Sequence, residues 1–176
     1  MAHILVTAGS NSSTSINFQL ARYTAGRLNQ NDILLRELAQ LNIPTYSEDI
    51  ERNSGFPSDI EALYADLKAA RGLVFSVNEH NGAPSAFAKN VLDWLSRKER
   101  NFLEGLPVLL LSTSPGRGGA QSARKAVEEL LPRFGAEVVA TFSLPSFRHM
   151  FQEGEGITDA GLQAEFRMAL ETFKNH

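Results

Sequence analysis

Short runs of apolar residues alternate along the chain with longer segments whose apolar residues recur at helical spacing. The short runs predict five strands, at residues 4–7, 33–36, 73–77, 108–112 and 137–141. The longer segments predict five helices, at residues 15–28, 58–70, 85–97, 120–134 and 158–173. The third and fourth runs are apolar at almost every position, which predicts strands buried on both faces of a sheet. Ser58 and Glu61 are expected to form a capping box at the start of the second helix.

The alternation of strands and helices predicts one α/β domain over residues 1–176, since no repeat, low-complexity stretch or long linker interrupts it. Right-handed crossovers favour a five-stranded parallel sheet in the order 2-1-3-4-5 with helices on both faces, which is the flavodoxin-like arrangement. The topological switch point of that sheet lies between strands 1 and 3. Ligand-binding loops are therefore expected after strands 1, 3 and 4.

The loop after the first strand is rich in hydroxyl groups. It places five of them in front of a predicted helix: Ser10, Ser12, Ser13, Thr14 and Ser15. Hydroxyls and the unpaired N–H groups of a helix amino end suit a phosphate. The sequence contains neither a P-loop nor a complete dinucleotide fingerprint, so a monophosphate fits better than a nucleoside triphosphate or a dinucleotide. The alternative is that Ser15 or a neighbour only caps the helix.

The loops after the third and fourth strands suit a flat ligand. Residues 78–82 offer Asn, Glu, His, Asn and Gly in succession, which suits a ring with polar edges, although a plain surface turn explains the same residues. Residues 113–119 contain Gly116, Gly118 and Gly119, which let the backbone approach a ring because glycine has no Cβ. The alternative for this loop is a strand-to-helix turn that requires positive φ.

Composition and charge narrow the range of partners. The 176 residues have a net charge of -3, which gives no long-range attraction to nucleic acid or to an anionic membrane. The absence of cysteine excludes disulfides, thiolate metal ligands and a cysteine nucleophile. The four histidines show no metal-ligand spacing, so no metal site is expected. With no membrane-length apolar run and no basic segment at the start, the expected location is the cytoplasm.

The three loops together resemble those of the NAD(P)H-dependent FMN reductases and quinone reductases, which are flavodoxin-like flavoproteins. The first family motif, Gly-Ser-x-Arg-x-x-Ser-x-Asn, is matched at Gly9, Ser10, Ser15 and Asn17, with Ser12 in place of the arginine. The second, Pro-Glu-Tyr-Asn-Gly followed by Lys-Asn-x-Leu-Asp-Trp, is matched at Glu79, Asn81, Gly82, Lys89, Asn90, Leu92, Asp93 and Trp94. Asn78 and His80 replace its proline and tyrosine. The third is carried by Ser114, Gly116, Gly118 and Gly119.

The resemblance implies an FMN site built from the three loops. It implies that the phosphate is held by Ser10, Ser15, Ile16 and Asn17. It implies that the isoalloxazine edge is lined by Asn78, Glu79, His80 and Asn81. It implies that the ring packs by Ser114, Gly116, Gly118 and Gly119. Because the flavin carries the chemistry in this family, no catalytic side chain is expected, and a general-base role for Glu79 is not favoured.

The resemblance also implies an activity and an assembly. NADPH or NADH would deliver hydride to flavin N5 and leave, and a quinone, flavin, azo compound or similar small acceptor would then take the same place in a ping-pong cycle. A homodimer or a dimer of dimers is implied, with the helices near residues 85–97 and 120–134 at the interface. Trp94 is a candidate interface residue, and burial within the subunit is its alternative.

Two other functions remain open at this point. A flavodoxin-like electron carrier would use the same loops, but such carriers are usually much more acidic than a net charge of -3. A descendant of the fold that does not bind flavin is suggested by the departures at Ser12, Asn78 and His80. Loss of the arginine at position 12 removes a charge-assisted donor typically worth about 1.5–3 kcal/mol, and Arg117 or a partner subunit is a candidate to compensate.

Overall fold

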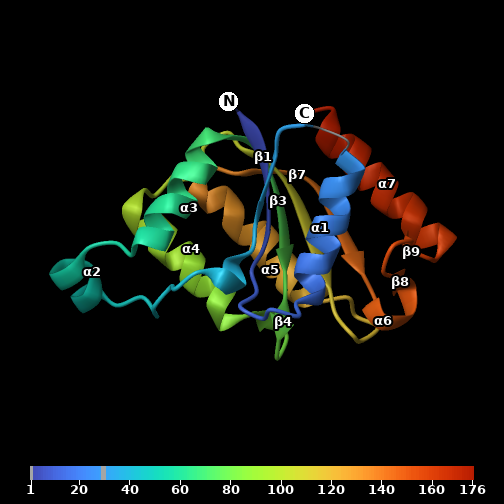
Figure 1. Ribbon diagram of the computed structural model, residues 1–176, viewed down its shortest axis with the longest axis horizontal. Coiled ribbons are helices and arrows are strands. Elements are labelled where there is room, and N and C mark those ends of the chain that lie inside the picture. Colours follow the sequence, from blue (N-terminus) through green and yellow to red (C-terminus); the bar gives the residue numbers. More distant parts are fainter. Residues whose placement is uncertain (1, 29–30) are drawn as a thin grey trace.

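The computed structural model describes residues 2–28 and 31–176 (Figure 1). Its centre is a five-stranded parallel sheet in the order β2-β1-β3-β6-β7. The strands are β1 (His3–Ala8), β2 (Ile33–Arg36), β3 (Ala70–Val77), β6 (Pro107–Thr113) and β7 (Glu137–Leu144). Numbered among themselves, they follow the order 2-1-3-4-5, so the predicted topology is confirmed. The two central strands, β3 and β6, are buried along nearly their whole length, as their continuous apolar runs predicted.

Helices cover both faces of this sheet. On one face lie α1 (Ile16–Leu28) and α7 (Ala160–Lys174), and on the other lie α3 (Ser58–Ala69), α4 (Ala86–Lys98) and α5 (Gln121–Leu130). Neighbouring strand residues point into different cores: Leu73 and Phe75 contact the α3–α4 side, whereas Val74 contacts the α1–α7 side. Among the described residues, no helix is long and apolar enough to cross a membrane.

Several short elements connect the larger ones, and the apolar pattern did not predict them as separate elements. They are η1 (Leu38–Gln40), α2 (Glu48–Ser54), β4 (Glu79–His80), β5 (Ala83–Pro84), η2 (Leu131–Phe134), α6 (Phe147–Met150), β8 (Phe151–Gln152) and β9 (Gly156–Ile157). Each is a helix of about two turns or fewer, or a strand of two residues. An element this short has too few positions to show a helical or strand spacing of apolar residues.

Two details of the predicted helices are wrong. Ser58 is the first helical residue of α3 and Pro57 is the N-cap, with no side-chain capping bond, so the expected capping box does not form. The predicted helix at residues 120–134 is α5 followed by the 3-10 helix η2, with Pro132 near the junction. Proline has no N–H to donate to the preceding turn, which explains why the α-helix ends at Leu130.

The segment between β2 and α3 is fastened to α4 by Asn90 and Trp94. The carboxamide of Asn90 donates to the carbonyl oxygen of Pro44 at 2.9 Å and accepts from the Tyr46 N–H at 2.7 Å. Trp94 Nε1 donates to the same Pro44 oxygen at 2.8 Å, and the side chain of Trp94 is fully buried. Of the two alternatives for Trp94, burial within the chain therefore holds. Beyond this attachment α2 projects from the body and buries no residue (Figure 1).

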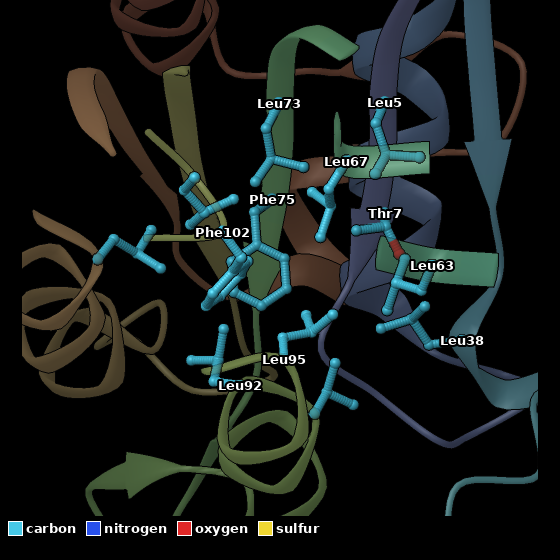
Figure 2. Close-up of a pocket in the computed structure, with 13 residues that line it drawn as sticks. Leu5, Thr7, Leu38, Leu63, Leu67, Leu73, Phe75, Leu92, Leu95 and Phe102 are labelled. Carbon is cyan, nitrogen blue, oxygen red and sulfur yellow. The ribbon is translucent and has the colours of Figure 1, made fainter. Parts of the chain in front are cut away.

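A small internal cavity of about 30 Å³ lies between the sheet and helices α3 and α4. Figure 2 shows Leu73 and Phe75 from the sheet facing it, together with Leu63 and Leu95 from the two helices. The polar lining residue is Thr7, whose hydroxyl already donates to the carbonyl of Arg36 at 2.7 Å. A cavity of this size and apolar character is a packing defect and has no room for a cofactor.

Candidate functional site

The loops after β1, β3 and β6 meet at the carboxyl edge of the sheet, as the topology predicted; this is the end of β3 at which β4 lies in Figure 1. The first loop joins the end of β3 through the Gly9 N–H, which donates to the carbonyl of Ser76 at 2.9 Å. It joins the beginning of α4 through Ser85, whose hydroxyl donates to the Gly9 carbonyl at 3.0 Å. The loops are thus bonded to one another and to the sheet.

Asn17 is the residue that binds these parts together most extensively. Its Oδ1 accepts from the Ser76 hydroxyl at 2.9 Å and from the Thr113 N–H at 3.0 Å. Its Nδ2 donates to the Thr113 carbonyl at 3.1 Å. The side chain is 3% exposed. The carboxamide therefore connects the start of α1 with the ends of β3 and β6, while the backbone N–H of Asn17 stays in the first helical turn, where it has no intrahelical acceptor.

The remaining hydroxyls of the first loop lie around the start of α1. Ser15 is buried and caps the helix by accepting from the Phe18 N–H at 3.2 Å, and accepting this bond leaves its hydroxyl able to donate as well. Ser10 is also buried, whereas Ser12, Ser13 and Thr14 are exposed. The half-buried Ile16 follows the cap as the first helical residue. The loop therefore presents exposed hydroxyls beside the unpaired N–H groups of a thirteen-residue helix.

Two residues outside the predicted site set hold the first loop in place. A Cβ added to Gly9 would lie 2.7 Å from the Cβ of Ala88 on α4, so the loop and the helix approach too closely for any other residue. Ser85 accepts from the Ala88 N–H at 3.1 Å, which caps α4, while its hydroxyl holds Gly9. The sequence predicts Ser85 only as the start of a helix, because Gly9, the residue that it contacts, is 76 positions away in the chain.

The second loop is a tight hairpin. Glu79 pairs with Pro84 and His80 pairs with Ala83. The two residues between the strands, Asn81 and Gly82, have φ of 54° and 77°. Positive φ at both central positions is the type I′ requirement, and Asn-Gly is its strongest sequence signal. The surface-turn alternative is therefore right about the backbone, and the turn places His80 and Asn81 in an exposed position.

Two side chains of the second loop point away from solvent. Glu79 Oε2 accepts from the backbone N–H of Ala123 in α5 at 3.0 Å. Asn78 has a buried Oδ1 with no hydrogen-bond partner among the described residues, although its backbone carbonyl accepts from the Ser85 N–H at 3.2 Å. Buried polar atoms are almost always satisfied, so an orphaned acceptor at the ligand edge of the sheet fits a donor supplied from outside the chain.

The third loop contains one glycine whose backbone conformation requires glycine and two whose exposed backbone could be approached by a ligand. Gly119 has φ of 57°, and a Cβ there would lie 3.1 Å from the backbone of Leu144. The positive-φ alternative is therefore right for Gly119. Gly116 and Gly118 are exposed, and a Cβ added to either would clash with no neighbouring atom. Ser114, half-buried, bonds through its hydroxyl to the Gly116 carbonyl at 3.2 Å.

The basic residues near the site differ in whether their side chains already have partners within the chain. Arg124 donates to the Ser143 hydroxyl at 2.9 Å and forms an ion pair with Glu128 at 2.8 Å, so it is already engaged. Arg117, in the third loop, is exposed. Over the described part of the chain, no group of three or more His, Asp or Glu side chains is placed to hold a metal ion.

This geometry fits FMN. It combines hydroxyls and N–H groups for a phosphate, an orphaned buried acceptor in Asn78 for a ring edge, and open glycine backbone for a ring face. The arrangement offers hydrogen bonds and shape, and the ring itself would supply the reactive atoms.

Comparison with known proteins identifies the family of the chain. A family model described as NADPH-dependent FMN reductase matches residues 2–149. The chain is 35% identical over 134 residues to an uncharacterised protein of Mycoplasma pneumoniae, which covers 74% of this chain and 76% of the relative. It is 34% identical over 98 residues to a quinone reductase of Escherichia coli K12, covering 56% of this chain and about half, 52%, of that enzyme.

The fold has close structural relatives as well. The flavoenzyme FerB of Paracoccus denitrificans, an NAD(P)H:acceptor oxidoreductase, superposes with a TM-score of 0.78 at 20% identity over 99% of this chain and 96% of that chain. FMN and a nicotinamide donor, the cofactors expected from the loop motifs, are those that the family description specifies. The match over residues 2–149, with three interlocked loops at the carboxyl edge of a flavodoxin-like sheet, shows that the chain belongs to the NADPH-dependent FMN reductase family of oxidoreductases.

Proposed function

We propose that this chain is an FMN-dependent NAD(P)H oxidoreductase that reduces a small acceptor, with quinones as the leading class. The observation that carries the proposal is the meeting of a hydroxyl-lined helix start, an orphaned acceptor and open glycine backbone at one edge of the sheet. The E. coli relative is named a quinone reductase, which supports the acceptor class. Flavins, azo compounds and similar oxidants are further candidate acceptors.

The phosphate of FMN would be held by the first loop. The hydroxyls of Ser10 and Ser15, with the N–H groups of Ile16 and Asn17, are our candidates, and the exposed Ser12 adds a hydroxyl where the family has an arginine. These donors are neutral, so the partial positive charge of the α1 amino end supplies the electrostatic attraction. Phosphate binding in this chain would therefore depend on many weak donors rather than on one charged side chain.

The ring would lie between the second and third loops. Asn78, Glu79, His80 and Asn81 would border its edge, the last three mainly through backbone groups of the hairpin. Ser114, Gly116, Gly118 and Gly119 would border its face. When bound, FMN supplies the hydride-accepting atom for a ping-pong exchange between NADPH or NADH and the acceptor. Fixed N–H groups from the two loops would stabilise negative charge on the reduced ring.

The assembly and the location are also proposals. A homodimer or a dimer of dimers is the arrangement that we infer from the family. The buried Trp94 does not supply its contact surface, because this side chain is fully enclosed within one chain. We propose a cytoplasmic location, consistent with a sequence that contains no cysteine.

An absorbance spectrum of the purified protein tests cofactor and activity together. We expect a yellow protein after incubation with FMN and desalting, bleached anaerobically by NADPH or NADH and recoloured by a quinone. Protein that stays colourless would contradict FMN binding. Protein that is yellow but is not bleached by either nicotinamide would favour an electron carrier instead.

A further inference from the structure

Helix α5 begins without a cap of its own. Its N-cap residue, Ala120, has φ of 61° and offers no side-chain acceptor, and its first turn contains no acidic residue. The first N–H groups of a helix have no intrahelical partner, and a side-chain acceptor with negative charge normally stabilises them. An acceptor from elsewhere in the fold is therefore expected at this helix start.

Glu79 is that acceptor. Its Oε2 lies 3.0 Å from the N–H of Ala123, in the first turn of α5, although the two residues are 44 positions apart. The carboxylate supplies both the hydrogen-bond acceptor and the negative charge that favour a helix amino end. Glu79 is half-buried, and helix α5 packs directly against strands β4 and β5.

The contact joins two of the three ligand loops. Glu79 opens the hairpin that carries His80 and Asn81, and α5 follows directly after Gly119 and Ala120, which both have positive φ. Among the hydrogen bonds of residues 2–28 and 31–176, the bond from Ala123 to Glu79 is the one that connects residues 78–84 with residues 114–123. This carboxylate therefore adds a directional bond between the hairpin and the start of α5 to the packing of α5 against β4 and β5.

We propose that Glu79 is a positioning residue of the flavin site, which sets the distance between the hairpin and the glycine-rich loop by capping α5. This inference rests on the proposed function, because it assumes that the two loops border the same ring. Removal of the cap removes the hydrogen bond between the two loops and leaves the packing of α5 against β4 and β5. A smaller fraction of the apoprotein then has the arrangement that binds, and the apparent Kd for FMN rises as that fraction falls.

The test compares Glu79→Ala and Glu79→Gln with a matched control. Asp159 also caps a helix with its carboxylate, accepting from the Leu162 N–H of α7 at 2.9 Å, and it contacts none of the three loops. Asp159→Ala therefore removes a similar cap without touching the site. The Kd of the apoprotein for FMN is measured by quenching of flavin fluorescence. Hydrogen exchange of the peptide around Ala123 is measured on the same proteins without FMN.

We expect Glu79→Ala to raise the Kd for FMN about fivefold, the fold-change that corresponds to an N-cap contribution of about 1 kcal/mol. We expect faster exchange at Ala123 in the same variant. Glu79→Gln keeps an acceptor oxygen and should restore most of both properties. Asp159→Ala should lower stability and leave the Kd unchanged.

An unchanged Kd in Glu79→Ala, or an equal rise in Asp159→Ala, would overturn the positioning role while leaving the proposed function intact. Failure of the unmodified protein to bind FMN would overturn the proposed function and, with it, a positioning role toward flavin. The two failures are distinguishable because the second already appears before any substitution is made.

Discussion

The strongest stability prediction concerns Asn17→Ala. The substitution removes three buried hydrogen bonds, two accepted by Oδ1 and one donated by Nδ2, which connect α1 with Ser76 and Thr113. A buried hydrogen bond contributes about 1 kcal/mol net, so three contribute about 3 kcal/mol. The loss is not offset by solvation, because the side chain is 3% exposed and water has little access to the abandoned groups of Thr113.

Equilibrium unfolding in urea measures this loss on the apoprotein. We expect the midpoint to fall with an unchanged slope, which marks a change in stability rather than in the denatured state. Asn11→Ala is the matched control, since Asn11 is an exposed asparagine of the same loop. Asn17→Asp is a second probe, because a carboxylate keeps acceptors for Ser76 and the Thr113 N–H but faces the Thr113 carbonyl with an oxygen in place of a donor.

The reasoning is refuted if Asn17→Ala costs less than about 1 kcal/mol, the contribution of a single hydrogen bond. It is also refuted if Asn17→Asp is as stable as the unmodified protein, since a buried carboxylate facing a carbonyl is unfavourable. A large loss in Asn11→Ala would show that the loop as a whole, rather than the Asn17 carboxamide, limits stability.

Three further predictions address phosphate binding, packing and pH. Ser12→Arg restores the family's charged donor. A charged hydrogen bond worth about 1.5–3 kcal/mol should lower the Kd for FMN at least tenfold at low salt, and less at high salt. An unchanged Kd in a fluorescence titration would place the phosphate elsewhere. Val91→Ile adds one methylene beside the cavity of about 30 Å³ and should stabilise the protein by up to about 0.8 kcal/mol in urea unfolding, whereas a loss would mean that the added group clashes. A hydrogen bond from Tyr64 lowers the pKa of Glu99 below its ordinary value of 4.5. The ionised Glu99 therefore stabilises the folded protein above pH 4.5, and this stabilisation is lost as the pH falls through the lowered pKa. Glu99→Gln should therefore weaken the fall of the urea midpoint between neutral and acidic pH, and an unchanged acid dependence would contradict this.

The fold was predictable because its main signal is local. Continuous apolar runs mark β3 and β6 as central strands, and helical spacing marks the five long helices, since each pattern is read within one segment. Handedness then restricts the strand order, and the order determines which loops meet. The hairpin was also present in local form, as Asn81-Gly82, but two-residue strands on either side carry no alternation by which to recognise it.

The hydrogen-bond partners of the residues in the candidate site could not be predicted from such local patterns. As residue types, Asn17 and Glu79 suit a ligand, and the family motif contains both. Their actual partners are Thr113, 96 residues along the chain from Asn17, and Ala123, 44 residues from Glu79. The contact of Ser85 with Gly9 is hidden from the sequence for the same reason, because it spans 76 residues.

The sequence by itself determined the strand order, the edge at which the three loops meet and the chemistry offered there, because burial period, turn residues and side-chain type are properties of single segments. Only the tertiary structure decided which polar groups of the three loops stay open at that edge and which form hydrogen bonds within the protein. A hydrogen bond depends on the positions of two atoms, and for Asn17 and Glu79 those positions are set by how α1, α5 and the sheet pack together. The same side chains that identify the site in the sequence therefore serve partly to hold its loops in place.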